Sequence, residues 1–352
     1  MQHFVALRKH FRFLRAVALV GSAATFATAA VGVSGSEASA FTAKSSAVNL
    51  SGVTITFGDQ LKEYQTIFAA TNALSGAAYK VNWTDFIGGP PVIAAETGGS
   101  VDLGDMAETP TIFAQAAGDP VKVVAVTQGA NPKVSPFDIL VPAGSPIKKL
   151  SQLRGQTIAV QEGTVEQYFL IQALKSAGIP YTAVTIENLT VTDASTAVTN
   201  GKVDAAVVSQ PLTGIDLAGG KVHQLINGAG YLQTLGYLTA SQAALANPAK
   251  AAAIADFINR FYRAAAALRK EPLLAAQTYV KTYGVSLAVA MQAVASAQSI
   301  ATPVTPAIIS YQQSEANTFL KLGLITKQIN VKGVFDLPYN KQVSKAAGLA
   351  AS

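Results

Sequence analysis

The chain has 352 residues, of which 50% are hydrophobic and 13% are charged, and this is enough apolar sequence for a large core and two lobes. It contains no cysteine, which excludes disulfides, thiolate metal sites, cysteine nucleophiles and a lipid-modified N-terminal cysteine. The net charge of +6 falls to +3 when residues 1–40, with four of the 26 Lys and Arg and one of the 20 Asp and Glu, are set aside. The composition therefore does not argue for nucleic-acid binding.

Residues 1–40 match a secretory signal peptide. Four basic residues precede an apolar segment of small residues at 16–33, and an A-x-A cleavage site follows. The basic residues are Arg8, Lys9, Arg12 and Arg15, and the site is Ala38-Ser39-Ala40, with Ala27-Thr28-Ala29 as a second candidate. An uncleaved membrane anchor is the alternative, which the small-residue core disfavours, and no later stretch is apolar enough to span a bilayer. We expect a protein that is free in a bacterial periplasm.

Histidine is scarce in this chain. Of the three histidines, only His223 lies beyond residues 1–40, so a Ser-His-Asp triad is not expected and a site of several histidines is excluded within one chain. His223 lies in KVHQLI, which has the pattern of a strand, and we interpret it as structural. We expect no metal, no cofactor and no enzymatic activity.

The first half of the chain alternates strands with helices. Strands are expected at 53–58, 79–86, 101–106 and 122–127, and helices over 61–74, 90–97 and 110–117. A loop rich in Gly, Pro and Asn at 128–135 is a natural point for the chain to cross to a second lobe.

The stretch 83–118 organises this half. Gly88-Gly89 forms a turn after one strand and Pro90 opens a helix, while Thr109 caps the next helix directly after another strand. Two helix N-termini therefore start at the carboxyl ends of two strands of one parallel sheet, where α/β sheets bind ligands. Free N–H groups and the helix dipole make such ends anion sites. Taken singly, each of these Gly and Pro residues is better explained as an ordinary turn or helix boundary than as part of a ligand site.

A second set of elements follows. Strands are expected at 138–141, 157–160, 184–189, 203–209 and 235–241, the last at the second crossover. Helices are expected at 151–155, 165–177, from a cap at Asp193 to Asn200, and from Pro211. From residue 248 the pattern is helical, with further helices at 272–283, 286–298 and 306–322 that we expect to cover the first lobe.

The chain also echoes itself. The segment 98–110, GGSVDLGDMAETP, resembles 200–211, NGKVDAAVVSQP, since both place Val-Asp after a helix-ending Gly and a Pro after the strand. One such echo fits two similar α/β lobes that face each other.

These residues together resemble the aliphatic-sulfonate-binding proteins of ABC importers, in the nitrate/sulfonate/taurine group of periplasmic binding proteins. The run GDMAETPTIFAQAAG at 104–118 carries the resemblance, which covers roughly the whole chain after the leader. Further landmarks occur in order: Gln60 after the first strand, WTDFIGGPP, PFDILVPAGSPI, LSQLRGQTIAV and YQQSEANTFLKLGLI. The resemblance implies a type II periplasmic-binding-protein fold. In this α/β fold two lobes, 41–132 with 242–352 and 133–241, enclose a ligand cleft and are joined by two crossover segments.

The resemblance also implies which residues face the ligand. They are Gln60, Gly88, Gly89, Ala107, Glu108 and Thr109 in the first lobe, and Gly163, Thr164, Val165 and Gln210 in the second. The chain departs from many relatives at Ser209-Gln210, where they place an aromatic residue and an Asp before the Pro, and this should leave the cleft roomier. Glu108 could meet the ammonium of an aminosulfonate or could cap a helix behind the site, and both interpretations stay open.

The leading hypothesis is a periplasmic component that captures a small organic sulfonate, taurine-like or an alkanesulfonate. It would act as a monomer, bind no nucleic acid and deliver this anionic ligand to a permease and ATPase at the inner membrane. The alternatives are a nitrate or other small-anion binding protein and a sensor module of the same fold. A pyrimidine-synthase-like enzyme shares the fold but uses His and Cys around iron, and this chain has no Cys.

The leader makes a direct prediction. Cleavage after Ala40 should give a mature chain that starts at Phe41, and mass spectrometry of the exported protein would read this N-terminus. An exported chain that still begins at Met1 would contradict the signal-peptide interpretation.

Overall fold

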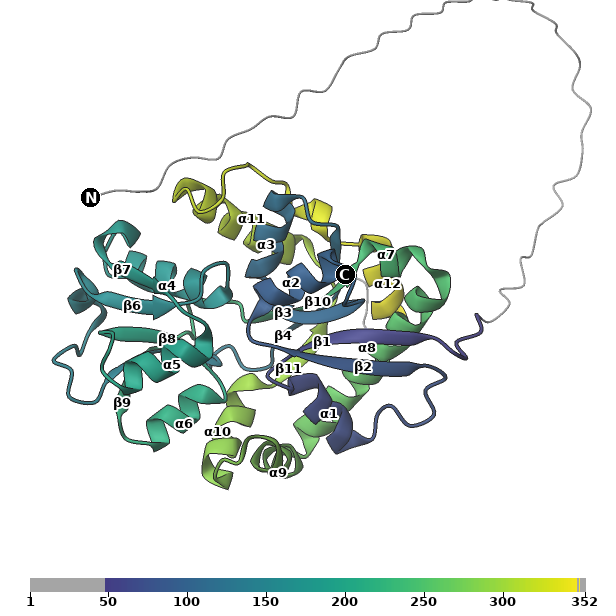
Figure 1. Cartoon of the computed structure of the whole chain (residues 1–352), viewed down its shortest axis with the longest axis horizontal. Helices are drawn as coiled ribbons and strands as arrows, with labels where there is room; N and C mark the ends of the chain where they lie inside the picture. Colours follow the sequence, from purple (N-terminus) through teal and green to yellow (C-terminus); the bar gives the residue numbers. More distant parts are fainter. Residues whose placement is uncertain (1–47, 347, 349–352) are drawn as a thin grey trace, which may run out of the picture. The chain divides into compact units, whose positions relative to one another are not determined.

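The computed structural model describes residues 48–346 and 348, so the predicted leader lies outside the described residues. Within them, strands form two separate sheets with helices on both faces of each (Figure 1). We call the part built on the first sheet the first lobe and the part built on the second sheet the second lobe.

The first sheet has six strands in the described chain, in the order β11-β4-β10-β3-β1-β2. Their bounds are β1 Thr54–Gln60, β2 Lys80–Phe86, β3 Leu103–Ala107, β4 Val121–Gly129, β10 Leu235–Ser241 and β11 Ser299–Thr302. Strand β1 pairs in parallel with β2 and β3, whereas β10 runs antiparallel to both β3 and β4. The sheet is therefore mixed, with its parallel part at the β1 to β3 side.

The second sheet has five described strands, in the order β7-β6-β8-β5-β9. Their bounds are β5 Phe137–Pro142, β6 Thr157–Val160, β7 Thr185–Asn188, β8 Ala205–Ser209 and β9 Val222–Asn227. Strand β6 pairs in parallel with β7 and β8, and β5 is antiparallel to β8 and β9. The chain enters this lobe between β4 and β5 and leaves it between β9 and β10.

Helices cover both faces of each sheet because alternate strand residues point to opposite sides. Ile158 and Val160 of β6 pack with one cluster that includes Phe169 of α4, while Ala159 between them packs with Val191 of α5. The helices of the two α/β units are α1 Glu63–Thr71, α2 Gly89–Thr97, α3 Thr109–Ala117, α4 Val165–Ser176, α5 Val191–Thr199 and α6 Leu212–Ala218.

The core of the first lobe is aromatic. Phe57 of β1 lies 4.9 Å from the ring of Phe257 and 5.3 Å from that of Trp83, and Phe68 of α1 stacks on Phe257 at 4.6 Å. Offset and edge contacts of this kind add to the free energy that burial of the rings supplies. They fix α1 and the long helix that carries Phe257 against one face of the first sheet.

The last third of the chain is helical, as predicted, apart from β11. Its helices are α7 Gln242–Ala246, α8 Pro248–Lys270, α9 Pro272–Tyr283, α10 Leu287–Ala297, α11 Pro306–Lys321 and α12 Leu337–Ala346; short 3-10 turns lie at Leu150–Leu153, Tyr181–Ala183 and Val331–Val334. These helices do more than cover the first lobe. Phe319 of α11 packs in one buried cluster with Tyr168 and Ile171 of α4 in the second lobe.

Three local expectations differ from the structure. The sequence predicts residues 235–241 at the end of the second lobe, but they form β10, which pairs between β3 and β4 in the first sheet, because a strand in this central position has two ladders of backbone hydrogen bonds. The cap of α5 is Thr190, whose hydroxyl accepts the N–H of Asp193, rather than Asp193 itself. Thr109 is the first residue of α3, and Glu108 occupies the cap position without a side-chain cap bond.

The echo between the two halves has a structural counterpart. Asp102 accepts the N–H of Thr56 at 3.0 Å and Asp204 accepts the N–H of Thr157 at 2.8 Å. In each lobe, an Asp just before one strand thus binds the beginning of its parallel neighbour. None of the described helices combines the length and apolar character needed to cross a membrane.

Buried carboxyl groups predict how stability depends on pH. Glu96 of α2 is 2% exposed and accepts the hydroxyl of Thr239 at 2.9 Å, and burial raises its pKa to about 8. When the pH lies between the ordinary pKa of a glutamate and this raised value, Glu96 keeps its proton in the folded chain but loses it in the unfolded chain. The free energy of unfolding should therefore fall as pH rises toward 8.

Urea unfolding at about pH 5.5 and pH 8 would measure this dependence. We expect Glu96→Gln to reduce the difference between the two pH values by at least about 1 kcal/mol, the equivalent of roughly one pKa unit. Glu187→Gln, at an exposed position of β7, is the control and should leave the difference unchanged. An unchanged difference in Glu96→Gln would contradict the assignment.

Candidate functional site

A cleft of about 200 Å³ lies where the strand ends of the two lobes meet. Turns that follow β1, β2 and β3 line it from the first lobe, and turns that follow β6 and β8 line it from the second. This is the edge at which α/β sheets bind ligands. Seven of the ten predicted site residues line it: Gln60, Gly88, Gly89, Ala107, Thr164, Val165 and Gln210.

The first-lobe wall is a set of backbone turns. Gln60 ends β1, where its side-chain amide donates to the carbonyl of Asp105 at 2.7 Å and its N–H donates to the Asp105 carboxylate at 3.0 Å. Gly88 has a φ of 85°, a conformation that favours glycine, and Gly89 begins α2. Because prolines occupy the next two positions of α2, Gly88 and Gly89 supply the N–H groups at the start of this helix.

The second-lobe wall is the start of α4. Gly163 has a φ of 74° and donates its N–H to the side chain of Gln167 at 2.9 Å. The hydroxyl of Thr164 donates to the carbonyl of Gln161 at 2.7 Å, so this group holds the turn together. Val165 is the first residue of the helix, where a backbone N–H has no carbonyl of its own helix to bind. Val165 lines the cleft, so the start of α4 forms part of the cleft wall.

Three predicted site residues do not line the cleft. Gly163 lies in the turn below Thr164, with Pro90 and Phe113 of the other lobe 3.7 Å from where its Cβ would be. Glu108 and Thr109 are fully buried and face α11: Glu108 accepts the hydroxyl of Tyr311 at 3.4 Å, and the hydroxyl of Thr109 donates to Glu315.

Burial raises the pKa of Glu108 to about 7. The pKa of Glu315 is also raised well above its usual range, by burial first and by the charge of Glu108 second. The two carboxyl groups therefore belong to a buried network behind the site that ties the start of α3 to α11.

Sequence reasoning missed three acids that line the cleft: Glu63, Asp105 and Glu166. Burial, and then the charge of Asp59, raise the pKa of Glu63 to about 7. The pKa of Asp105 is raised well above its usual range by burial and by the charges of Asp59 and Glu63. Burial likewise raises the pKa of Glu166, against the opposing effect of its own N–H and of the hydroxyls of Thr164 and Ser209. Each acid lies one to three positions from a predicted residue, which is the one signal that could have found it: Glu63 follows Gln60, Asp105 precedes Ala107 and Glu166 follows Val165.

The turn between β1 and α1 is strained. Leu61 and Lys62 have φ values of 52° and 62°, which side chains other than glycine seldom adopt. The ammonium of Lys62 lies 3.6 Å from the carboxylate of Asp85, on the neighbouring strand, and Lys62 is not among the residues that line the cleft. The strain is compatible with a ligand-binding turn that the surrounding structure holds in place.

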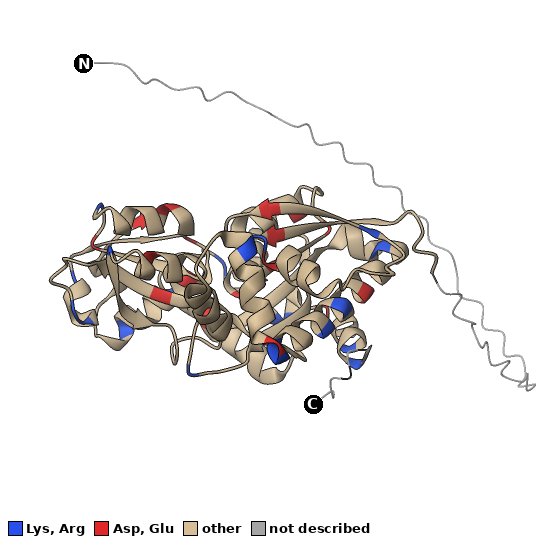
Figure 2. Cartoon of the chain, turned by 90° about the horizontal axis from the view of Figure 1, so that it is seen from below, with Lys and Arg blue, Asp and Glu red and all other residues tan. Residues whose placement is uncertain are grey.

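Within the described residues, the cleft has no Lys, Arg or His in its lining. Acidic and basic residues are few and scattered over the chain (Figure 2), and the described part contains no group of acidic and histidine side chains that could hold a metal ion. Neutral donors and carboxylates are therefore the polar groups that a ligand meets.

Comparison with known proteins gives the family. A family model described as NMT1/THI5 like matches residues 90–272. A protein of Escherichia coli (strain K12) that is named as an aliphatic sulfonates-binding protein is 32% identical over 255 residues, which cover 72% of this chain and 78% of that protein. The chain belongs to the NMT1/THI5-like family. The resemblance to aliphatic-sulfonate-binding proteins is thereby confirmed.

Solved structures that are similar to this chain agree with the fold. The alkanesulfonate-binding protein SsuA from Xanthomonas axonopodis pv. citri, bound to MOPS, superposes with a TM-score of 0.75 at 24% identity, over 81% of this chain and 98% of that chain. The periplasmic aliphatic sulphonate binding protein SsuA from Escherichia coli has a TM-score of 0.69 at 27% identity, over 81% and 92% of the two chains. The predicted fold class is confirmed.

Gly88 offers a test of the cleft. A Cβ at Gly88 would lie 2.5 Å from Oε1 of Gln161 in the opposite lobe, so Gly88→Ala should turn this amide away and weaken binding by about tenfold. The control is Gly99→Ala, because Gly99 has a similar φ of 76° but no atom within 4 Å of its Cβ position.

Calorimetry with propane-1-sulfonate, a ligand of the class named for the relatives, would give both affinities. Equal loss in the two variants would mean that backbone strain, not contact across the cleft, causes the effect.

Proposed function

We propose that this protein is the periplasmic solute-binding component of an ABC importer and that its ligand is a small organic sulfonate. The observation that carries the proposal is a cleft between two lobes whose walls present backbone N–H groups from the starts of α2 and α4. The Escherichia coli relative and the SsuA structures support it through what they are named to bind.

The chemistry of a sulfonate suits these donors. Its single negative charge is spread over three oxygens, so neutral N–H groups at helix starts can hold it without a full countercharge. Gly88, Gly89 and Val165 would supply backbone donors, and the amides of Gln161 and Gln210 would supply side-chain donors. Gln60 would shape the wall, since its amide is already bound to the carbonyl of Asp105.

A phosphate ester suits the cleft less well. Phosphate carries more charge and usually recruits Arg or Lys in bidentate or charge-assisted contacts. The described lining contains neither residue, and its carboxylates would oppose a second negative charge. The cleft chemistry therefore favours a singly charged oxyanion.

The remaining predicted residues shape the wall or support it from behind. Thr164 holds the turn through Gln161, Gly163 allows its left-handed backbone, and Glu108 with Thr109 anchors the start of α3 to α11. Ala107 ends β3, and its small side chain would let the ligand approach the turn between β3 and α3 closely. None of these residues needs to donate to the ligand for the site to work.

Delivery would follow the mode of a two-lobed receptor. The lobes are joined by segments 130–136 and 228–234, which allow closure about the ligand by hinge bending. The closed, monomeric protein would dock on a permease with its ATPase at the inner membrane after the leader is removed. Small-angle scattering would then give a smaller radius of gyration with ligand than without.

A ligand panel tests the assignment. A compound at about 100 times its dissociation constant should stabilise the fold by roughly 2.7 kcal/mol, which raises the melting temperature by several degrees. The panel contains short and long alkanesulfonates, taurine, nitrate, sulfate and a phosphate ester, and we expect shifts with sulfonates. A shift with nitrate alone would assign the protein to small inorganic anions, and shifts confined to the phosphate ester would contradict the proposal.

A further inference from the structure

One end of the cleft is built from carboxylates and aromatic rings. We call it the acidic end, and it consists of Glu63, Tyr64, Asp105, Phe261, Tyr279 and Tyr283, which all line the cleft from the first lobe. The residues come from α1, β3, α8 and α9. Nothing in a sulfonate calls for carboxylates, so the acidic end needs a different partner.

The carboxylates of Glu63 and Asp105 have few polar partners within the described part of the chain. The neighbouring carboxylate of Asp59 does have partners. It accepts the N–H groups of Tyr64 at 3.0 Å and Gln65 at 2.8 Å, and these two bonds hold the first turn of α1. Asp105 is only 7% exposed, and its carboxylate accepts the backbone N–H of Gln60 but no hydrogen bond from a described side chain. Glu63 makes no hydrogen bond or ion pair to another side chain in the described part of the chain.

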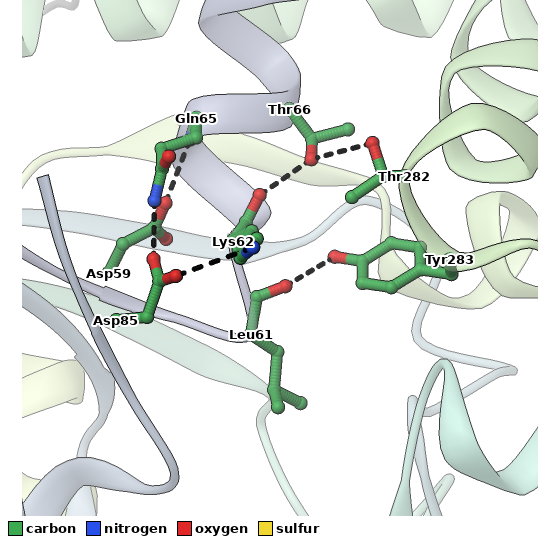
Figure 3. Close-up of polar contacts among 8 residues, drawn as sticks. All are labelled: Asp59, Leu61, Lys62, Gln65, Thr66, Asp85, Thr282 and Tyr283. Atoms are coloured by element: carbon green, nitrogen blue, oxygen red, sulfur yellow. Dashed lines mark hydrogen bonds and ion pairs between the residues drawn. The ribbon is translucent and has the colours of Figure 1, made fainter.

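No cation of the described chain compensates these charges. The sequence neighbour of Glu63, Lys62, pairs with Asp85 at 3.6 Å and is 58% exposed (Figure 3). Arg269 lines a side pocket next to Glu63, but its guanidinium donates to the carbonyl of Ser299 at 2.6 Å. Asp105 is buried and Glu63 is half-buried. Carboxylates in such positions are normally paired, and here both line the cleft.

The rings of the acidic end are held in place. Tyr279 and Tyr283 lie on one face of α9 with ring centres 5.0 Å apart, and Tyr64 stacks on Phe261 at 4.3 Å. The hydroxyl of Tyr283 donates to the carbonyl of Leu61 at 2.8 Å (Figure 3). This bond connects Tyr283 of α9 to the strained turn between β1 and α1. Aromatic faces beside carboxylates attract organic cations through the ring quadrupole.

The side pocket extends the acidic end. It has a volume of about 70 Å³ and shares Glu63 and Tyr279 with the cleft. Its other walls are mainly apolar, with Ile67, Leu268 and Val294 among them. A group that enters past Glu63 would therefore place carbon atoms, rather than further polar atoms, in this pocket.

We propose, as an extension of the proposed function, that the sulfonate ligand also carries an N-alkylated ammonium group that lies between Glu63 and Asp105. Its alkyl substituents contact Tyr279 and Tyr283 and point toward the side pocket. The sulfonate of the same molecule lies at the starts of α2 and α4. A zwitterion thus meets both the neutral donors and the carboxylates, whereas a simple anion would meet uncompensated carboxylates at close range.

Two matched ligands test the charge. The compounds 3-(trimethylammonio)propane-1-sulfonate and 3-(trimethylsilyl)propane-1-sulfonate share the sulfonate, the chain and a three-methyl end, and they differ in the positive charge. Calorimetry should show that the ammonium compound binds at least about tenfold more tightly. We expect 3-aminopropane-1-sulfonate to bind less tightly than the trimethylated compound, because it lacks the carbon contacts with the rings.

Variants locate the preference. Glu63→Gln and Asp105→Asn should each reduce the ratio of the two affinities by about threefold or more and leave the silyl compound nearly unchanged. Tyr279→Leu should also reduce the ratio, while Tyr279→Phe keeps the ring and should retain it. Glu187→Gln, which removes an exposed acid of β7 in the second lobe, is the matched control and should retain the full ratio. Thermal melting of each free variant checks that it is folded.

The outcomes separate this inference from the proposed function. Equal affinity of the two matched compounds for the native protein would overturn the inference and leave sulfonate binding intact. A ratio that persists in both Glu63→Gln and Asp105→Asn would overturn the location of the charge. If 3-aminopropane-1-sulfonate bound more tightly than the trimethylammonio compound, the inference that the ammonium group carries alkyl substituents would be overturned. Failure of all sulfonates, including taurine and alkanesulfonates, would remove the proposed function and the inference with it.

Discussion

Two aspartates set the alignment on which the cleft depends. Asp102 and Asp204 each accept a backbone N–H at the beginning of the neighbouring parallel strand, Thr56 in one lobe and Thr157 in the other. With the strand beginnings fixed, the opposite ends also fall in register, and the turns after β1 and β3 open at one edge of their sheet. The same holds for β6 and β8. A shift of one residue would reverse every side chain of a strand, so the two bonds help to specify which residues reach the cleft.

The cleft combines two demands that a single simple anion does not satisfy. Backbone donors at Gly88, Gly89 and Val165 suit a delocalised negative charge, while Glu63 and Asp105 face the same space without a described base. Because charges act strongly in a site from which water is excluded, both demands shape the affinity. Glu63 and Asp105 lie on the first lobe, whereas the third acid of the lining, Glu166, lies on the second. The first lobe would therefore contact both ends of one ligand, through these two acids and through the start of α2.

The sequence allowed much of this architecture to be predicted, because its local signals are strong. Gly88-Gly89 before Pro90 marks a turn and a helix start, and the segment GDMAETPTIFAQAAG identifies the family. The strands and helices can be predicted from the spacing of hydrophobic residues and from the Gly and Pro residues that mark element ends, with errors of one or a few residues at those ends. The fold of the family then supplies the cleft.

Other features depend on contacts that no local pattern reports. The pairing of β10 with β3 and β4 joins residues more than 100 positions apart. The approach of Tyr279 and Tyr283 to Glu63 likewise brings α9 to α1. The direction of Glu108 is set by Tyr311 and by its burial against α11, so its position beside predicted site residues was misleading as a guide to its partners.

Anomalous diffraction from the sulfur of a bound ligand would test the central claim most directly. The chain has three methionines and no cysteine, and Met106 lines the cleft, so the sulfur of propane-1-sulfonate is the anomalous peak that appears only in crystals grown with a saturating amount of it. The account predicts a peak in the cleft, close enough to the N–H groups of Gly88, Gly89 and Val165 for the sulfonate oxygens to accept their hydrogen bonds. A peak outside the cleft, or one against Glu63 and Asp105, would contradict the account.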